Sequence, residues 1–246
     1  MKLLKGISIP NSYPCLYLEE FRTLVVGDTH LGYELALSRK GVYLPQTSYQ
    51  YVKGVVDDLV KMTHAESIVF LGDVKHEFGR PTPQEWAEVR DMLNFLFSEG
   101  LSVHVVRGNH DNYILEILRK FNVGLHDPFM QIGNISLIHG DKEAEFPKET
   151  KIIIMAHEHP AVLSRDMSGS RYKFKCFLLG KYRNYRVIVV PALSPLSAGV
   201  GVNETRKEEL LSPILKASDI DSFTPIVVEE NVGVFRFPQI GIMRSI

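Results

Sequence analysis

The feature that most constrains the fold is a set of apolar runs that each end in acidic, amide or imidazole side chains. Residues 67–71 (SIVFL) predict a buried strand, which is followed at once by Gly72 and Asp73 and then by His76. Four further runs end in the same way. The polar residues after the five runs are Asp28, Thr29 and His30; Asp73 and His76; Asn109, His110 and Asp111; His139 and Asp141; and His157, Glu158 and His159.

These endings are expected to meet at one place. Open α/β sheets gather their binding sites at the carboxyl ends of the strands. Asp28 and His30 lie two residues apart, as do His157 and His159, so an extended chain would point each pair to one face. The glycines beside them allow tight turns next to a ligand. The sequence therefore predicts one shared pocket.

The first half of the chain alternates strand and helix patterns. Two helix starts are predicted by capping boxes, Thr47 with Gln50 and Thr82 with Glu85, the second with proline at the first helical position. The second half is richer in strands and begins with a hairpin. The predicted strands cover 23–28, 67–73, 101–108, 129–140 (hairpin), 151–159, 172–180 and 185–193, and the third helix covers 112–121.

This order of elements predicts an α/β fold of four layers (αββα), in which two mixed sheets face each other and helices lie outside. The length favours a single domain over residues 1–246. Residues 200–246 are expected to be a C-terminal extension whose structure the pattern leaves open. Within it, 206–216 predicts a short helix and 225–237 a closing hairpin.

The charge composition gives no overall signal for nucleic-acid binding. The net charge of −1 gives no overall basic surface, so nucleic-acid binding would need a local cluster. The best cluster is a tract that is either a solvated strand face or a nucleic-acid track, with Tyr182 and Tyr185 among its charges. Its members are Lys173, Lys175, Lys181, Arg183 and Arg186.

The expected location is the cytoplasm. Cys15 and Cys176 form no closely spaced metal or redox motif, which favours a reducing compartment. The first residues contain too short an apolar run for a secretion signal. No segment approaches the ~18 apolar residues of a membrane span, so no membrane partner is expected.

The residue types at the strand ends point to metal chemistry. Carboxylates, imidazoles and one amide oxygen, without a thiolate, suit manganese, iron or zinc. Two ions need a bridging anion, and Asp73 is the natural candidate because a rigid strand fixes its carboxylate. Two metals ~3.5–4 Å apart can bind a phosphoester oxygen and generate hydroxide for attack.

Taken in order, these motifs resemble those of the calcineurin-like metallophosphoesterases. The resemblance spans residues 27 to 160. Within that superfamily the chain is similar to the archaeal SbcD-related phosphoesterases and to the bacterial PdeM-like ligase-associated endonucleases, a similarity that the later strands extend to about residue 200. It lacks the Asp-Arg-Gly of protein Ser/Thr phosphatases. The motifs are GDTH, GDVKH, GNHD, HGD and AHEH, in this order.

The resemblance implies a role for each site residue. Asp28, His30 and His159 would hold the first metal, Asn109, His139 and His157 the second, and Asp73 both. His110 would act as general acid or stabilise the phosphate, and Asp111 would orient it. His76 occupies a position where the nuclease branch tends to have histidine. Ala156 replaces a common glycine, for which only a backbone adjustment is expected.

The sequence thus predicts a metal-dependent phosphodiesterase with two divalent ions, manganese first and iron or zinc as alternatives. The expected substrate is DNA, as single strands, flaps or ends. A phosphodiesterase of small or cyclic nucleotides and a non-catalytic scaffold of the same fold are the alternatives, and a homodimer is left open. Lys75 is expected to be a solvated charge or, less strongly, a phosphate contact, and Glu158 and Asp141 are expected to support the ligands.

Overall fold

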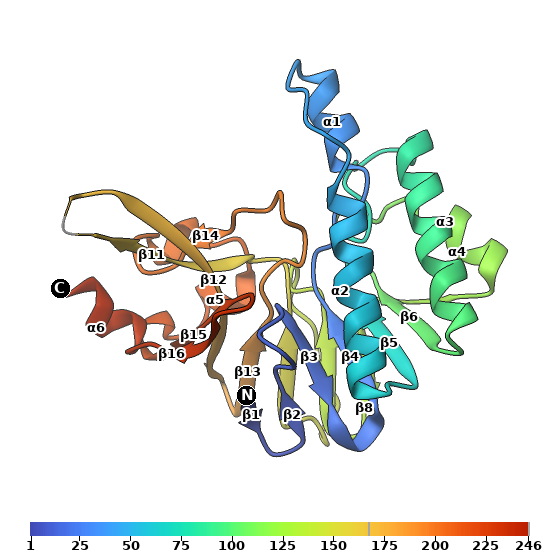
Figure 1. Ribbon diagram of the computed structural model, residues 1–246. Helices are drawn as coiled ribbons and strands as arrows, with labels where there is room; N and C mark the ends of the chain where they lie inside the picture. The colour runs from blue at the N-terminus through green and yellow to red at the C-terminus, as the bar shows by residue number, and fades with distance from the viewer. Residues whose placement is uncertain (167, 246) are drawn as a thin grey trace.

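Two mixed β-sheets face each other in the computed structural model, which describes residues 1–166 and 168–245 (Figure 1). The predicted α/β architecture of two sheets with helices outside is confirmed. The first sheet contains, in spatial order, β1 (Lys2–Leu4), β2 (Ile7–Ser8), β3 (Cys15–Leu18), β4 (Thr23–Val26), β5 (Ser67–Phe70), β6 (Ser102–Val106) and β7 (Gly124–His126).

The second sheet combines parallel and antiparallel strands. Its spatial order is β14 (Val200–Gly201), β11 (Pro160–Arg165), β12 (Arg171–Tyr182), β13 (Tyr185–Val189), β10 (Ile152–Met155), β9 (Ile135–Ile138) and β8 (Phe129–Ile132), and β15 (Thr224–Glu229) joins β12 and carries β16 (Gly233–Arg236). The hairpins predicted around 133–134 and over 225–237 are confirmed by the β8–β9 and β15–β16 pairings.

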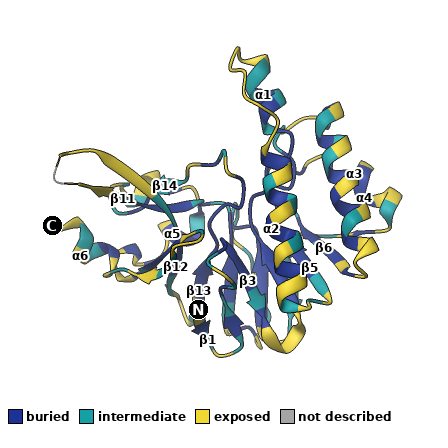
Figure 2. Cartoon of the chain, in the orientation of Figure 1, coloured by how far each residue is buried: buried dark blue, intermediate teal, exposed yellow. Residues whose placement is uncertain are grey.

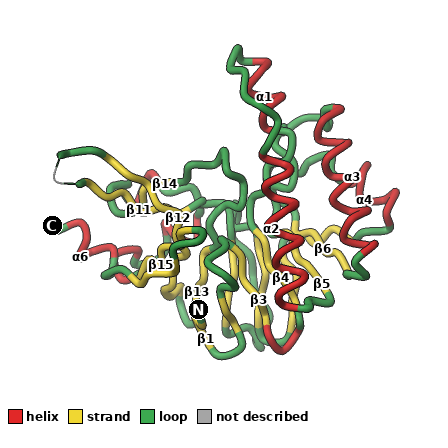
Figure 3. Tube along the Cα trace, in the orientation of Figure 1, coloured by secondary structure: helices red, strands yellow, loops and turns green. Residues whose placement is uncertain are grey.

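Helices α2 (Ser48–Thr63) and α3 (Pro83–Ser98) cover the outer face of the first sheet (Figure 3). The predicted capping box of α3 is confirmed, because the Thr82 side chain and Glu85 cap each other's backbone. The predicted box of α2 is wrong, since Thr47 makes no side-chain cap. The first-turn Ser48 N–H instead donates to Glu34 Oε1 (2.9 Å), a buried carboxylate from a preceding helix.

That preceding helix, α1 (Tyr33–Arg39), was not predicted and projects from the edge of the first sheet (Figure 1). Two predicted helices are shorter than expected. The segment 112–121 forms α4 (Leu115–Leu118) followed by the 3-10 turn η2 (Arg119–Phe121). The segment 206–216 forms η3 (Lys207–Glu209) and α5 (Pro213–Lys216), because Pro213 starts a new helical turn.

Three clusters of buried apolar side chains fill the space between the layers. The first lies between the first sheet and its helices, and the second contains inward residues of both sheets, such as Val25, Val69 and Ile154. The third lies against the other face of the second sheet, where residues 200–246 contribute Ile214 and Phe223. The cover there is made of short pieces, α5, η4 (Ile220–Ser222) and α6 (Ile240–Arg244), rather than long helices. Figure 2 shows the buried strands at the centre of the molecule.

The strand directions bring the polar strand ends together. Strands β4, β5 and β6 run parallel in the first sheet, and β9, β10 and β13 run parallel in the second. Their carboxyl ends lie at the same edge of the sandwich, so the polar loops that follow them come together between the two sheets. None of the described helices is both long and apolar enough to cross a bilayer.

Candidate metal centre

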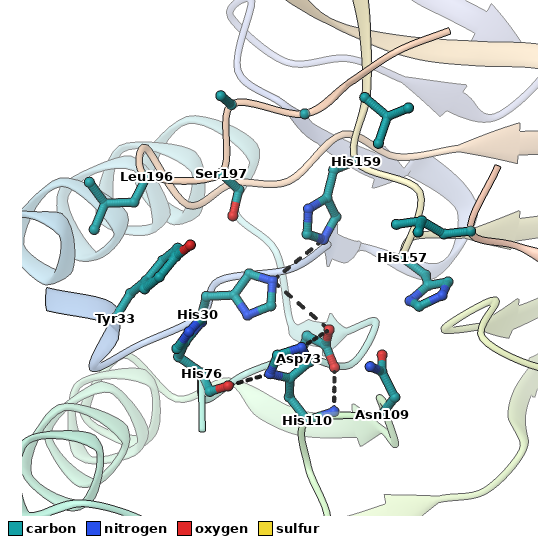
Figure 4. A pocket seen from close by; sticks show the side chains of 14 residues that line it. His30, Tyr33, Asp73, His76, Asn109, His110, His157, His159, Leu196 and Ser197 are labelled. Carbon is teal, nitrogen blue, oxygen red and sulfur yellow. Dashed lines mark hydrogen bonds and ion pairs between the residues drawn. The ribbon is translucent and has the colours of Figure 1, made fainter. Parts of the chain in front are cut away.

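Side chains from both sheets converge at this edge (Figure 4). Asp28, Asp73 and Asn109 follow β4, β5 and β6, and His139 and His157 follow β9 and β10. All seven predicted ligands take part in contacts with one another, as described below. The predicted convergence of the strand ends is therefore confirmed, whereas their binding of metal stays a prediction.

The first donor group contains Asp28, His30, Asp73 and His159. His159 Nε2 lies 3.2 Å from Asp28 Oδ1, and His30 Nε2 lies 3.4 Å from His159 Nε2. His30 Nε2 is also 3.9 Å from Asp73 Oδ2. One carboxylate oxygen from each aspartate and two imidazole nitrogens thus face a common point.

The second donor group contains Asp73, Asn109, His139 and His157. His139 Nε2 lies 3.0 Å from Asn109 Oδ1 and 3.1 Å from His157 Nδ1. Its distance to Asp73 Oδ1 is 3.4 Å. Asp73 therefore turns one oxygen to each group, which is the arrangement that the bridging role requires.

The chemistry of these donors fits divalent cations. Asp28 Oδ1 is buried, and its near neighbour is the His159 imidazole at 3.2 Å, so its charge must be balanced by a protonated His159 or by a bound cation. Burial lowers the pKa of His30 to about 3 and that of His157 to about 4, so both rings are neutral at pH 7. Against the effect of burial, the neighbouring Asp28 raises the pKa of His159, so a cation bound beside it would compete with a proton on that ring. Neutral imidazole is the form that binds metal.

A backbone carbonyl on the Nδ1 side of the ring fixes the orientation of His139. Its Nδ1 lies 2.6 Å from the carbonyl oxygen of Leu71, and a carbonyl only accepts, so Nδ1 carries the proton. Nε2 faces the second group, where, against the effect of burial, Asp73 and Asp28 raise the pKa of the ring to about 10, so a cation that binds there would displace the Nε2 proton. Metal-binding histidines are generally held by such a contact on the opposite nitrogen.

The backbone around the donors is strained. Asp28, His30, Asp73, His157 and His159 have φ angles of 45°, 44°, 50°, 67° and 47°. Side chains other than glycine rarely adopt this region, at a cost of about 1–3 kcal/mol each. Strain concentrated on five of the seven predicted ligands indicates that the loops are shaped for these side chains rather than for stability.

Two glycines allow the loops to approach each other. A Cβ on Gly108 would lie 2.2 Å from Asp73 Oδ1 and 2.3 Å from Asp73 N. A Cβ on Gly72, which has φ +83°, would lie 2.6 Å from His139 Nδ1. The Asp73 carboxylate therefore packs directly against the backbone that precedes Asn109.

The three predicted catalytic residues lie beside the donor groups. The His110 N–H donates to Asp73 Oδ1 (2.9 Å), and its ring Nε2 is 3.8 Å from Asp73 Oδ2. The His76 ring lies 5.4 Å from both the His30 and His110 rings and stacks on Tyr33 at 3.7 Å. Phe78 stacks on His110 at 3.7 Å, although 55% of Phe78 is exposed.

The carboxylate of Asp111 makes no hydrogen bond to the His110 ring, whose Nδ1 contacts the His76 carbonyl. Its carboxylate is buried and accepts from the backbone N–H groups of Val74 (3.1 Å) and Gly108 (3.0 Å). Burial, aided by the nearby Asp73 charge, raises the pKa of Asp111 to about 6. The carboxylate thus ties the loop after β5 to the loop that carries His110, and the expected role of Asp111 in orienting that ring stays a prediction.

Lys75 is not the solvated charge that the sequence suggested. It has no exposed surface, and its Nζ donates to the backbone carbonyls of Glu77, Gly79 (3.1 Å) and His110 (2.7 Å). Glu158 is also buried, and its carboxylate accepts from the N–H groups of Leu211 (2.9 Å) and Ser212 (2.9 Å). Charge patterns in the sequence could not reveal either partner set.

The basic tract does not form one track. Lys175 is partly buried, and its Nζ donates to the carbonyls of Ala192 (2.7 Å) and Ser194 (2.6 Å). Lys181 and Arg186 face each other at the far end of β12 and β13, where they line a separate cavity of about 470 Å³. Lys173 is the member whose Nζ reaches a wall of the candidate site, at the Gly199 carbonyl (2.9 Å).

The donor groups lie at the base of a pocket of about 590 Å³. One wall carries Tyr33 and His76, and the other consists of residues 196–200 with Leu211 (Figure 4). Sequence reasoning missed Tyr33 and this second wall. Small and apolar residues in a loop after a strand carry no local signal of a binding surface.

Comparisons with known proteins bear on the family and the fold of the chain. The family model described as calcineurin-like phosphoesterase matches residues 21–221. The crystal structure of Pseudomonas putida nuclease MPE is similar to this chain, with a TM-score of 0.66, 19% identity and coverage of 92% of each chain, a likeness of fold. The E. coli phosphoesterase YfcE overlaps more weakly, with a TM-score of 0.43 and 16% identity over 72% of this chain and 83% of that one. No curated protein matches the sequence.

Proposed function

The chain belongs to the calcineurin-like phosphoesterases, and we propose that it is a two-metal phosphodiesterase that hydrolyses single-stranded, flap or end regions of DNA. The observation that carries the proposal is the position of Asp73, which turns one carboxylate oxygen to each of two donor groups. A nuclease of the SbcD-related or PdeM-like kind is the finer proposal that the motifs support.

The proposed ligands follow the two groups. Asp28, His30 and His159 would hold one ion, Asn109, His139 and His157 the other, and Asp73 both. When bound, the ions would supply Lewis acidity and a hydroxide nucleophile at neutral pH. Manganese is the proposed metal, with iron and zinc as alternatives, because the donors are oxygen and imidazole nitrogen.

His110 is proposed to donate a proton to the leaving oxygen. Its Nδ1 faces the carbonyl oxygen of His76, so that nitrogen is committed as a donor and Nε2 alone faces the pocket. When the ring is protonated, Nε2 carries the proton that the leaving oxygen needs. His76, beside both His30 and His110, would contact the phosphate oxygens from the same side.

The pocket favours a diester over a monoester. None of the described residues that line it is lysine or arginine. A phosphate monoester carries close to two negative charges at neutral pH, whereas a diester carries one. Sites that bind the doubly charged group generally supply arginine or lysine, and two bound ions would already balance the single charge of a diester.

Side chains at the rim of the pocket favour nucleic acid as the substrate. Tyr33 and the exposed Phe78 stack on the two proposed catalytic histidines and offer aromatic faces near the pocket. Such faces bind unstacked bases. Lys173 lies at the opposite wall and could contact a backbone phosphate. A continuous basic track for duplex DNA is not formed by the tract described above.

Two alternatives differ in what they require. A phosphodiesterase of small or cyclic nucleotides would need the pocket of about 590 Å³ alone and not the rim. A scaffold would not need the strained backbones of the proposed ligands, which a catalytic metal centre explains. For that reason we rank the scaffold last.

The test is a hydrolysis panel with added Mn²⁺. It compares single-stranded DNA, duplex DNA, RNA, a cyclic nucleotide and bis(p-nitrophenyl) phosphate, with Asp73→Asn as the control. We expect metal-dependent cleavage of single-stranded DNA and of the small diester. Cleavage of the cyclic nucleotide and small diester alone would favour the first alternative, and no cleavage together with no bound metal would favour the scaffold.

Matched charge reversals test the nucleic-acid part separately. Lys173→Glu and Lys181→Glu change the net charge equally, but Lys173 lies beside the pocket wall and Lys181 at the far end of β12. We expect Lys173→Glu to raise KM for an oligonucleotide and Lys181→Glu to leave it unchanged. Equal effects of the two variants would mean that only overall charge matters.

A further inference from the structure

We propose that Lys75 is a positioning residue that holds His110 with only Nε2 free to face the substrate. This inference rests on the proposed function of the same site, and it concerns a residue outside both donor groups. Lys75 follows the shared aspartate by two positions, on the loop that continues to His76 and Phe78.

The ammonium of Lys75 joins two loops. Its Nζ donates to the carbonyl oxygens of Glu77 and Gly79 on its own loop and to that of His110 on the loop after β6. An ammonium has three N–H donors, and three carbonyls surround it, so each donor has an acceptor. The His76–Gly79 segment and His110 are thus fixed relative to one another by one group.

Every polar atom of His110 except ring Nε2 has a hydrogen-bond partner. Its backbone N–H donates to Asp73 Oδ1 (2.9 Å), and its backbone carbonyl accepts from Lys75 (2.7 Å). Its Nδ1 donates to the carbonyl of His76, whose position depends on the loop that Lys75 closes. The remaining atom, Nε2, faces Asp73 Oδ2 at 3.8 Å. Lys75 therefore supports the ring both directly and through His76.

Filling of space alone does not explain a lysine at this position. Lysine is almost never fully buried without a charged partner, because its charge is costly to desolvate. No carboxylate lies within ion-pair distance of Lys75 Nζ among the described residues. An apolar side chain would fill the same space without that cost. What it could not do is gather three carbonyls from two loops.

A buried carboxylate completes the arrangement. Glu85 Oε1 accepts from the N–H of Glu77 (2.7 Å), and Oε2 accepts from that of Thr82 (2.6 Å). At Glu77 the carbonyl oxygen therefore binds the lysine while the N–H binds the glutamate. The loop that carries His76 is held between a cation and an anion that both lie in the interior.

The kinetic test compares Lys75→Met with Lys75→Arg and His110→Ala. We expect Lys75→Met to keep its metal content and to lose about ten- to a hundredfold in kcat, the scale of an ångström of misplacement. The loss should be larger for a dinucleotide, which has a poor leaving group, than for bis(p-nitrophenyl) phosphate. Lys75→Arg, which keeps the charge and the donors, should recover part of the rate.

A double variant shows whether Lys75 acts through His110. Adding Lys75→Met to His110→Ala should cost little further activity, because the ring that it positions is gone. Losses that multiply would overturn the proposal, as would a failure of both Lys75 variants to fold. Lys175→Met is the matched control, since it removes a lysine whose Nζ also binds carbonyls, and its loss should not depend on the leaving group.

A spectroscopic readout separates this inference from the proposed function. Long-range ¹H–¹⁵N NMR, with His110→Gln to assign the signal, should show His110 protonated at Nδ1 in the wild type. Lys75→Met should give a mixture of the two tautomers. An unchanged tautomer would overturn the positioning role even if the enzyme is active. A changed tautomer in a protein without hydrolase activity would leave the role of Lys75 intact and remove the proposed function.

Discussion

Replacement of Gly108 by alanine tests the packing on which the shared carboxylate depends. The new Cβ would lie 2.2 Å from Asp73 Oδ1, 2.3 Å from Asp73 N and 3.0 Å from Asp73 Cγ. Comfortable contacts to carbon begin at about 3.5 Å, so the two loops must separate by roughly an ångström. The backbone nitrogen of Asp73 cannot rotate away as a side-chain tip could, and therefore Asp73 itself must move.

The expected cost follows from that displacement. Overpacking of a tight site costs about 1–3 kcal/mol. For a chain of this length each kcal/mol corresponds to about 2–4 °C, so Tm should fall by roughly 2–12 °C. Because Asp73 faces both donor groups, we also expect reduced binding of both ions, not of one.

The assay is a thermal melt with and without Mn²⁺, together with metal analysis of the purified protein. Gly54→Ala is the matched control, because Gly54 lies within α2 with no atom within 4 Å of the added Cβ. That change should stabilise the helix by about 0.5–1 kcal/mol and leave metal binding unchanged. Wild-type metal content and Tm in Gly108→Ala would refute the claim that close packing sets the position of Asp73.

Three further predictions follow from single residues. Asp73→Asn should bind less metal and lose nearly all hydrolysis, since the amide cannot neutralise two cations, and two tightly bound ions per chain in this variant would contradict the shared role. His110→Ala should keep its metal and lose roughly 10²–10⁴-fold in rate, with partial recovery on substrates with good leaving groups, and loss of metal would instead place His110 among the ligands. Desolvation lowers the pKa of Lys175 to about 8, below its unfolded value, so the unfolded chain binds more protons between about pH 8 and 10.5 and the free energy of unfolding should rise across that window. Urea titrations at pH 7.5 and 9.5 should show this rise in the wild type and a smaller one in Lys175→Met, and equal rises would exclude the effect.

The elements that carry the site can be predicted from local patterns of residues. Apolar runs such as 67–71 bury their side chains on both faces of a strand, so they indicate parallel strands without tertiary information. The polar residues that end those runs then had to meet, because parallel strands share one edge. Thr82, Pro83 and Glu85 likewise predicted the start of α3, since a capping box joins residues only three apart.

The partners of the charged groups, by contrast, depend on contacts between distant parts of the chain. Lys75 and Lys173 are both basic residues next to strand patterns, yet one is fully buried and the other is exposed. The difference arises because the carbonyl of His110, in the loop after β6 and 35 residues away in the chain, reaches Lys75 together with two carbonyls of its own loop. Likewise Thr47 does not cap α2 because Glu34 of α1 does. Whether an ammonium or carboxylate is stable in the interior depends on the acceptors and donors that other loops bring to it, and only the folded arrangement of those loops supplies them.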